Sequence, residues 1–277
     1  MPRARDVSKL RQMLDLERYL ARIGLEGRPG IAELHRAHVT SIPFENLDPR
    51  RGIPVSVAID DIERKLVVDR RGGYCFEHNL LLAAALEALG AEVEWLLARV
   101  RTGSRRGTSR PRSHLVLRVH AGGATWHADV GFGLGSPLEP LPFGRGGVHE
   151  QSGWRFRVVE DGPELVLQSA GDGDWADLYG FVPEPVPFVD IEVSNWFTAT
   201  HPRSPFVTGL IVCRQRADGT RTALSDWDGL TLTEQSPSET VVTTVQWDDV
   251  PALLERRFGL DVVDGGYAPS SFTRRFG

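Results

Sequence analysis

One of the two cysteines in this chain lies where a nucleophile would be expected. Cys75 belongs to the segment RGGYCFEHN, residues 71–79, in which a glycine-bearing turn gives way to a run of helical character. The start of a helix offers unpaired N–H groups and the positive end of the helix dipole, and both favour a thiolate. Gly72 and Gly73 would allow the backbone to approach the group that the thiolate attacks. Free cysteines are more often buried and inert, so a core residue is the alternative; Cys213, which follows the apolar residues 210–212, is expected in the core.

A thiolate nucleophile needs a nearby imidazole and a group that orients the imidazole. The pair Gly122 and Gly123 separates two alternating runs and predicts a two-residue hairpin turn. In that register Val116 faces Asp129, and His114 lies on the same sheet face, diagonal to Asp129. Diagonal neighbours are about 7 to 8 Å apart, a distance that an imidazole–carboxylate hydrogen bond can span. The sequence therefore predicts a His114–Asp129 pair, on condition that the hairpin keeps this register.

Two other histidines are alternatives for the base. His78 is one helical turn after Cys75, but no carboxylate is placed to orient its ring. His127 shares the sheet face of Asp129 but lies opposite Arg118. The remaining histidines are expected at the surface or in structural hydrogen bonds: His35, His38, His120, His149 and His201. No metal site is predicted, because the thiolates are too few for a zinc set.

Two phenylalanines lie in glycine- or proline-containing segments next to these residues. Phe132 stands between two glycines in DVGFG, residues 129–133, and Phe44 lies in SIPFENLD, residues 41–48, which is predicted to be a loop. Either ring could face a ligand, although most phenylalanines pack in a core. Glu45 is expected to be a structural carboxylate, with Arg22 as a candidate partner.

The order of predicted elements separates helices from strands. Helical spacing of apolar residues predicts helices over residues 7–23, 31–38, 58–68 and 75–89. Alternating runs predict strands over residues 92–100, 113–120, 124–130, 154–159, 164–168, 208–216, 220–224 and 239–247, and a last helix over 248–258. This segregation favours the α+β class over alternating βαβ units.

Composition and charge exclude several classes of protein. The 277 residues are 41% hydrophobic and 25% charged, as in ordinary globular proteins. With 32 basic and 37 acidic residues the net charge is −5, which gives no drive toward nucleic acid or anionic membranes. The N-terminus lacks the apolar core of a signal peptide, and no run approaches the roughly 20 apolar residues of a membrane span. A cytoplasmic protein is therefore expected.

One segment departs from average composition. Residues 101–112, RTGSRRGTSRPR, contain five arginines in twelve positions and lead directly into Ser113 and His114. A solvated hairpin loop is the simpler interpretation. Guanidinium groups also suit phosphates, so a phosphate-bearing ligand is the alternative.

Together these motifs resemble those of the arylamine N-acetyltransferases. The matching motifs are Tyr19-x-x-Arg22-Ile23, IPFENL at residues 42–47, RGGxCxExN at 71–79, Ser113-His114, DVGFG at 129–133, Asn195-Trp196-Phe197 and Ser204-Pro205-Phe206. They follow one another in the order of that family over nearly the whole chain. The resemblance is weakest after about residue 210, where only a β-then-helix character matches.

The resemblance implies an α+β protein built in three parts. A helical bundle over residues 1–91 would carry the nucleophile, a central antiparallel β-barrel over 92–200 would carry the histidine and the aspartate, and an α/β lid would follow over 201–277. The site would be a Cys-His-Asp triad like that of cysteine proteases.

The resemblance also implies an activity. Cys75 would be the nucleophile, His114 the base and Asp129 the group that orients it. The enzyme would transfer acetyl from acetyl-CoA to arylamines, arylhydrazines or arylhydroxylamines by a ping-pong mechanism through an acetyl-Cys75 thioester. Phe44 and Phe132 would line the acceptor pocket.

The remaining implications concern the donor and the partners. Ser113, Ser204 and Phe206 would contact acetyl-CoA, which acts as co-substrate without a metal, and the protein would be a monomer or homodimer. The alternative function is an amide synthase that closes a macrolactam from a carrier-bound polyketide thioester, since such enzymes are similar to this family. A hydrolase with the same three residue types and a binding scaffold with an inactive site are further alternatives.

Overall fold

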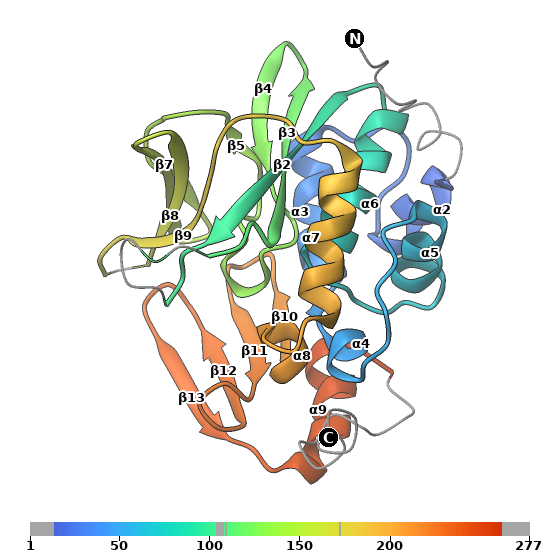
Figure 1. Ribbon diagram of the computed structural model, residues 1–277, viewed down its shortest axis with the longest axis vertical. Coiled ribbons are helices and arrows are strands. Elements are labelled where there is room, and N and C mark those ends of the chain that lie inside the picture. The colour runs from blue at the N-terminus through green and yellow to red at the C-terminus, as the bar shows by residue number, and fades with distance from the viewer. Residues whose placement is uncertain (1–13, 104–107, 109, 172, 262–277) are drawn as a thin grey trace.

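The computed structural model describes residues 14–103, 108, 110–171 and 173–261, with helices gathered on one side of the molecule and strands on the other (Figure 1). The helices before the first long strand are α2 (Leu16–Arg22), α3 (Ile31–Ser41), α4 (Leu47–Arg50), α5 (Ile59–Glu63), its π-helical continuation η1 (Arg64–Val68) and α6 (Cys75–Ala88). These ranges confirm the helices predicted over 31–38, 58–68 and 75–89. The start of the helix predicted over 7–23 lies outside the described residues.

The segment predicted to be a loop, residues 41–48, is instead structured. Phe44–Glu45 forms strand β1, and α4 begins at Leu47. Strand β1 pairs antiparallel with β10 (Ile211–Gln215), so its partner comes from the far end of the chain. A strand of two residues has no local signal, and this tertiary pairing is the reason that the loop prediction was wrong.

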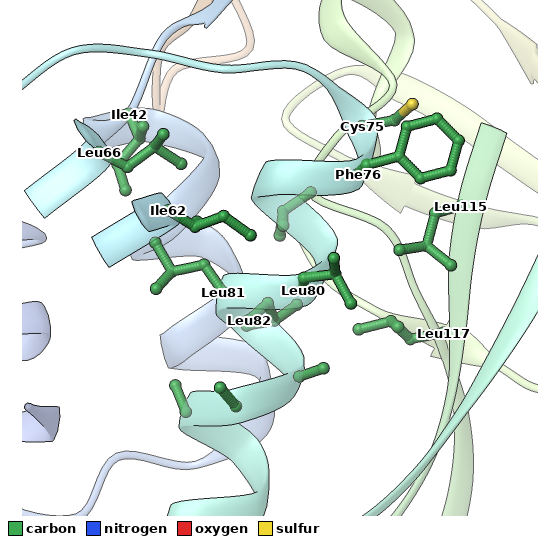
Figure 2. Packing of buried hydrophobic residues seen from close by; sticks show 14 of the residues in the cluster. Ile42, Ile62, Leu66, Cys75, Phe76, Leu80, Leu81, Leu82, Leu115 and Leu117 are labelled. Carbon is green, nitrogen blue, oxygen red and sulfur yellow. The ribbon is translucent and has the colours of Figure 1, made fainter. Parts of the chain in front are cut away.

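Helix α6 runs through the centre of the helical layer. All but the last of its fourteen residues are buried, and the helix is apolar on every side, which is typical of a core helix. Figure 2 shows Ile62 and Leu81 on one side of α6, and Leu80 with Leu115 and Leu117 on the other. Leucines 115 and 117 belong to β3 (His114–Ala121), so α6 is packed directly against this strand. The first turn of α6 is thereby fixed beside the start of β3.

The larger sheet has eight antiparallel strands in the order β5-β4-β3-β2-β9-β8-β7-β6. In chain order these are β2 (Glu92–Val100), β3, β4 (Ala124–Ala128), β5 (Leu141–Pro142), β6 (His149–Gln151), β7 (Trp154–Asp161), β8 (Glu164–Ala170) and β9 (Ala176–Phe181). The sheet curls into a nearly closed, barrel-like form around a core of its own that includes Leu96, Val116 and Phe156. The predicted β-barrel is confirmed at this level; strands β5, β6 and β9 were not predicted.

The hairpin that was predicted to set the active-site register is present. Gly122 and Gly123 have φ angles of 61° and 75°, as a two-residue hairpin turn of this twist requires. Arg118 lies opposite His127, and His120 opposite Thr125, as predicted. The condition for a His114–Asp129 pair is therefore met.

The smaller sheet has the order β1-β10-β11-β12-β13, with all pairs antiparallel. Its later strands are β11 (Arg221–Ser225), β12 (Thr231–Gln235) and β13 (Thr240–Thr244), and the short helices beside it are α8 (Pro205–Thr208), η3 (Trp247–Asp249), α9 (Val250–Leu253) and η4 (Leu254–Phe258). Because β1 is its edge strand, this sheet is shared between the predicted parts 1–91 and 201–277. The three-part division itself stays a prediction.

Helix α7 (Phe188–Thr200) was not predicted and lies within the part predicted as β-barrel. Its sequence is rich in β-branched and aromatic residues, which favour strands, and its exposed face carries apolar residues such as Val193 and Trp196. Asn195 anchors α7 to the site region, because it donates to the Val55 carbonyl at 2.9 Å and accepts from the Tyr74 hydroxyl. Among the described helices, none has the length and apolar character to cross a membrane.

A buried ion network links α4, η1 and α6. Lys65 Nζ lies 2.7 Å from Asp48 Oδ2 and 2.7 Å from Glu77 Oε1, while Arg71 Nη2 lies 2.7 Å from Glu45 Oε1 and 3.0 Å from Asp48 Oδ1. Burial raises the pKa of Glu77. Burial would also raise the pKa of Asp48, but the charges of Lys65 and Arg71 outweigh this effect and lower it. The network therefore depends on both cations to keep three buried carboxylates paired.

The carboxylate of Glu45 has a different partner from the one expected. Besides Arg71, it accepts the Leu47 N–H at 2.7 Å. Arg22, the expected partner, instead donates to the Leu66 carbonyl at 3.0 Å. Glu45 is structural, as predicted, but it acts through Arg71.

Replacing Lys65 with methionine should destabilise the protein strongly. The carboxylates of Asp48 and Glu77 would lose a shared buried cation, and breaking a buried pair in this way typically costs about 3–5 kcal/mol. Urea unfolding would measure the loss. The matched control is Arg64→Met, whose partner Asp61 and own side chain are 41% and 65% exposed, so its loss should stay below about 1 kcal/mol. Equal losses in the two variants would show that burial of the Lys65 network does not matter.

Candidate functional site

Cys75 is the first residue of α6 and is 2% exposed. The preceding residue, Tyr74, is the N-cap of the helix, and its N–H donates to Glu77 Oε2 at 3.0 Å. The Cys75 Sγ lies 3.6 Å from the Ser113 carbonyl oxygen, just before β3. Figure 2 shows the sulfur at the end of the helix, beyond the leucines that pack farther along it. The thiol thus occupies the helix start that the sequence predicted.

The two glycines before Cys75 serve packing within the protein. A Cβ on Gly72 would lie 2.2 Å from the Pro43 carbonyl oxygen, and one on Gly73 would lie 2.7 Å from Glu77 Oε2. The Gly73 carbonyl also accepts the Glu45 N–H at 2.7 Å. These contacts explain both glycines without the approach to a substrate that was expected of them.

His114 and Asp129 form the predicted pair. His114 Nε2 lies 2.7 Å from Asp129 Oδ2, and the Cys75 side chain is close enough to the His114 ring to contribute to its raised pKa. Both polar side chains are almost completely buried. The structure therefore joins imidazole and carboxylate by a hydrogen bond and places the thiol beside the imidazole.

The charges in this chain stabilise each other. Burial alone would lower the pKa of His114, but the charge and hydrogen bond of Asp129, followed by the contact with Cys75, raise it to about 10. Burial would raise the pKa of Asp129, but the charge of His114 and several hydrogen bonds hold it well below its usual range. At neutral pH the pair is therefore imidazolium and carboxylate.

Asn79 is a positioning residue to which the sequence analysis gave no role. It lies one helical turn after Cys75, and its Nδ2 donates to Asp129 Oδ1 at 2.9 Å and to the Leu115 carbonyl at 2.7 Å. The Gly131 N–H donates to the same carboxylate oxygen at 2.9 Å. Asn79 thus ties the helix that carries the thiol to the carboxylate. The available signal was its i+4 spacing from Cys75, which places the two on one helix face.

His78, the alternative base, is engaged elsewhere. Its Nδ1 lies 2.8 Å from His38 Nε2 and its Nε2 lies 3.2 Å from the Pro43 carbonyl, while the Tyr19 hydroxyl lies 2.8 Å from His38 Nδ1. Burial lowers the pKa of His78 to about 4, so the ring is neutral. Both ring nitrogens of His78 therefore have other partners, whereas the His114 ring is in contact with Cys75. Within the described ranges, no three His, Cys, Asp or Glu side chains are grouped to hold a metal ion.

His35 supports the backbone at Asp129. Its Nε2 accepts the Asp129 N–H at 3.1 Å, and its Nδ1 lies 3.0 Å from the Leu138 carbonyl, to which it donates. Burial is the main cause that lowers the pKa of His35 to about 4. The prediction of a satisfied structural histidine is confirmed here, in a place that bears directly on the site.

Aromatic rings surround the chain of polar groups. The Phe132 ring meets His114 edge-on, with centroids 5.1 Å apart. Phe206 lies 6.1 Å from Phe44 and 5.5 Å from Tyr74, again between ring centroids. The structure thus gathers Phe44, Phe132 and Phe206, which come from three distant segments, near the first turn of α6.

The two serines expected to contact acetyl-CoA have other roles in the structure. Ser204 is the N-cap of α8, accepts the Phe206 N–H at 3.3 Å, donates to the Thr198 carbonyl at 2.6 Å and is 1% exposed. The contact of Ser113 with Cys75 is made by its backbone carbonyl oxygen, which lies 3.6 Å from the Cys75 Sγ. Contact of these serines with a donor stays a prediction.

The arginine-rich segment is described only in part, because residues 104–107 and 109 lie outside the described ranges. Its first arginine, Arg101, lies 2.6 Å from Asp161, 2.7 Å from Glu164 and 3.3 Å from Asp177. This arginine is therefore engaged with acids of the large sheet, and the two alternatives for the segment stay open for the others.

Comparison with known proteins agrees with this geometry. The model of an N-acetyltransferase family matches residues 29–266. The arylamine N-acetyltransferase of Mycolicibacterium smegmatis is 40% identical over 263 residues, which are 91% of this chain and 94% of the relative. The chain belongs to the arylamine N-acetyltransferase family. It is accordingly an acetyltransferase.

Solved structures of arylamine N-acetyltransferases have the same fold as this chain. The structure of the Mycobacterium marinum arylamine N-acetyltransferase in complex with CoA has a TM-score of 0.84 and 36% identity, covering 89% of this chain and 93% of that one. The Salmonella typhimurium arylamine N-acetyltransferase has a TM-score of 0.82 and 30% identity, covering 91% of this chain and 93% of that one. The mixed α/β architecture with its barrel-like sheet is therefore that of the arylamine N-acetyltransferases.

Replacing Gly131 with alanine should damage this acetyltransferase. The added Cβ would lie 2.8 Å from the Cys75 Cα and 2.9 Å from Asn79 Nδ2, so the loop after β4 must move away from α6. Overpacking of this kind costs about 1–3 kcal/mol, and here it separates Asp129 from the thiol helix. Thermal melting and acetyl-transfer rates would both fall. Gly147→Ala is the matched control, because Gly147, like Gly131, is not at positive φ, and no atom lies within 4 Å of the added Cβ. An active Gly131→Ala protein would contradict the close packing.

Proposed function

We propose that the enzyme transfers acetyl from acetyl-CoA to arylamines, arylhydrazines or arylhydroxylamines through an acetyl-Cys75 thioester. The observation that carries the proposal is the buried chain in which Asp129 holds His114 and His114 contacts Cys75. A thiolate paired with an imidazolium is the reactive form of a cysteine nucleophile. Family membership supplies the acetyl-transfer chemistry for which this nucleophile is suited.

In the first half-reaction the Cys75 thiolate attacks the carbonyl carbon of acetyl-CoA. The new carbon–sulfur bond gives a tetrahedral intermediate, which collapses as the bond to the CoA sulfur breaks. The imidazolium of His114 gives its proton to the departing thiolate, and free CoA leaves. Asp129 stabilises the imidazolium before the transfer and keeps the ring oriented afterwards.

The start of α6 is suited to the charge on the tetrahedral intermediate. The first N–H groups of a helix have no acceptor within the helix, and they lie at the positive end of its dipole. The N–H of Cys75 is one of these groups. It is the donor that we assign to the developing oxyanion.

In the second half-reaction the amine attacks the acetyl-Cys75 carbonyl. Neutral His114 takes the proton from the amine nitrogen as the carbon–nitrogen bond forms, and the Cys75 thiolate leaves. Aromatic amines have low basicity and are unprotonated at neutral pH, so a single base is sufficient. Phe44 and Phe132, which the structure gathers near the site, would line the acceptor pocket.

The donor assignment draws on the relatives. The Mycobacterium marinum relative is known in complex with CoA, which supports CoA as the carrier used by this chain. Ser113, Ser204 and Phe206 are proposed as its contacts, with Ser204 acting through its backbone or through the turn that it caps. Monomer and homodimer are both compatible with this proposal.

The test separates the two half-reactions. Purified protein mixed with acetyl-CoA alone should gain one acetyl group, located on Cys75 by peptide mass spectrometry, with release of one equivalent of free CoA. Addition of an aniline should then remove the acetyl group and yield the acetanilide. Initial rates against both substrates should give parallel double-reciprocal lines.

Other outcomes identify the other candidate functions. A stable, reactive thiol that takes no acetyl from acetyl-CoA would refute the proposal, and acylation by a carrier-bound polyketide thioester would then identify the amide synthase. Release of acetate without an amine, at a rate that an amine does not change, would identify a hydrolase.

A further inference from the structure

His127 is a buried histidine next to the site that the mechanism above does not use. It lies on β4, two residues before Asp129, and its ring stacks on Phe181 with centroids 5.1 Å apart and an interplanar angle of 9°. Its Nε2 lies 2.7 Å from the Tyr179 hydroxyl, whereas its Nδ1 has no hydrogen-bond partner among the described residues. Burial lowers the pKa of His127 to about 4, so the ring is neutral.

Tyr179, on β9, connects His127 to the site. Its ring packs against the His114 ring with centroids 4.8 Å apart, and its hydroxyl interacts with the Asp129 carboxylate, which helps to raise the pKa of the phenol. The residue is completely buried, and burial raises the pKa of its hydroxyl well above the usual value. Tyr179 therefore remains a neutral phenol with one proton to donate.

The direction of each hydrogen bond follows from the chemistry of the groups. An ionised carboxylate can only accept, so the single proton of the Tyr179 hydroxyl is directed to Asp129. The phenol oxygen must then accept from His127, which places the proton of the neutral imidazole on Nε2. The unpartnered Nδ1 agrees with this tautomer, because a buried lone pair without a partner costs less than a buried N–H without one.

We propose that His127 is a positioning residue: through the Tyr179 hydroxyl it holds the Asp129 carboxylate, and thereby the His114 ring, in the orientation that reaches Cys75. Without the His127 N–H, the Tyr179 hydroxyl is free to rotate toward other acceptors. The carboxylate then loses one of its donors, and the imidazole that rests on it loses part of its constraint. The inference rests on the proposed function in one respect: acetylation of Cys75 is the reaction that the orientation of the His114 ring serves.

Other groups around Asp129 limit the expected size of the effect. Asn79 from α6 and the Gly131 N–H both donate to Oδ1, and His35 from α3 holds the Asp129 backbone N–H. These contacts remain when His127 is changed. We therefore expect a partial loss, roughly tenfold in the rate constant for acetylation of Cys75, as for one hydrogen bond to a charged group.

The experiment is a double-mutant cycle on His127 and Tyr179. His127→Leu removes the donor, Tyr179→Phe removes the hydroxyl but keeps the ring on His114, and the double variant removes both. If His127 acts through the hydroxyl, His127→Leu has its tenfold effect in the wild type and none in the Tyr179→Phe background. His127→Gln, whose amide N–H can reach the same oxygen, should recover most of the rate.

Two readouts are measured for each variant. Single-turnover acetylation gives the rate constant and its dependence on acetyl-CoA concentration, which should keep its half-saturation value. Alkylation of Cys75 by iodoacetamide between about pH 5 and 10 reports the reactivity of the thiol without any acetyl donor. His120→Leu on the neighbouring strand β3, where the ring contacts Thr125 and Glu94, is the matched control and should leave both readouts unchanged.

The outcomes distinguish this proposal from the proposed function. Equal effects of His127→Leu in both backgrounds, or a lower melting temperature with unchanged alkylation and acetylation, would overturn the positioning role. If His127→Leu does not fold, His127→Gln is compared in the wild type and in the Tyr179→Phe background, and a loss of equal size in both backgrounds overturns the role. Wild-type protein that is alkylated at Cys75 but never acetylated would refute the proposed function, and the alkylation cycle alone would then decide the role of His127.

Discussion

Cys75→Ser protein should take no acetyl group from acetyl-CoA, and its rate of acetyl transfer to an aniline should fall by roughly 10⁴-fold or more. Serine keeps nearly the same shape, so the fold and the His114–Asp129 pair remain. Its hydroxyl does not ionise beside an imidazolium as a thiol does, and the attack on the thioester is lost. Intact-mass spectrometry and single-turnover assays would measure the two effects.

The second cysteine provides the matched control for this experiment. Cys213 is 1% exposed on β10, and burial raises its pKa to about 12, so it is protonated and inert at neutral pH. Cys213→Ala should accept one acetyl group at the wild-type rate, although it loses some stability. Acetylation of the Cys75→Ser protein at another residue would contradict the assignment of the nucleophile.

Asp129→Asn should lower the rate of Cys75 acetylation by about 10³- to 10⁴-fold. Asn79 Nδ2 and the Gly131 N–H both donate to Oδ1, so the amide oxygen of the new asparagine must take that position. Its NH₂ group then faces His114 Nε2 and donates to it. The imidazole is forced to carry its proton on Nδ1, and it can no longer rest as an imidazolium held by a charge. Single-turnover acetylation would measure the loss, and an active Asp129→Asn protein would exclude the carboxylate from the mechanism.

The same pair makes stability depend on pH in a defined direction. The pKa of His114 is about 10 in the folded protein, above the usual value of 6.5. The stabilisation from its protonation is therefore complete below about pH 6.5 and is lost as the pH rises toward 10. The free energy of unfolding of the wild type should exceed that of Asp129→Asn by an amount that shrinks across this range. A difference that grows with pH would contradict the charged pair.

The part of the site that follows from local register could be predicted from the sequence. His114 and Asp129 belong to one hairpin, and the glycine pair at its turn fixes which residues face each other. The approach of Cys75 to His114 could not be derived in this way, because it depends on how α6 packs against β3. For that contact the resemblance to a family supplied the expectation. The role of Asn79 depends on the same packing and was missed for the same reason.

Two of the elements that were not predicted are stabilised by distant partners or have mixed signals. Strand β1 is stabilised by its pairing with β10, and its two residues are too few to give a sequence signal for a strand. Helix α7 contains residue types that favour strands, and its anchor is a contact of Asn195 with Tyr74 and Val55. In both cases tertiary contacts, and not local propensity, decide the structure.

The pairing of β1 with β10 has a consequence for synthesis of the protein. Phe44 lies opposite Cys213, so in a chain that is still growing on the ribosome β1 lacks its antiparallel partner strand until Gln215 has been made and has left the exit tunnel. The thiol helix and the hairpin with His114 are complete much earlier. Nascent chains released before that point should therefore carry the three polar groups but lack the strand pairing that holds Phe44 opposite Cys213.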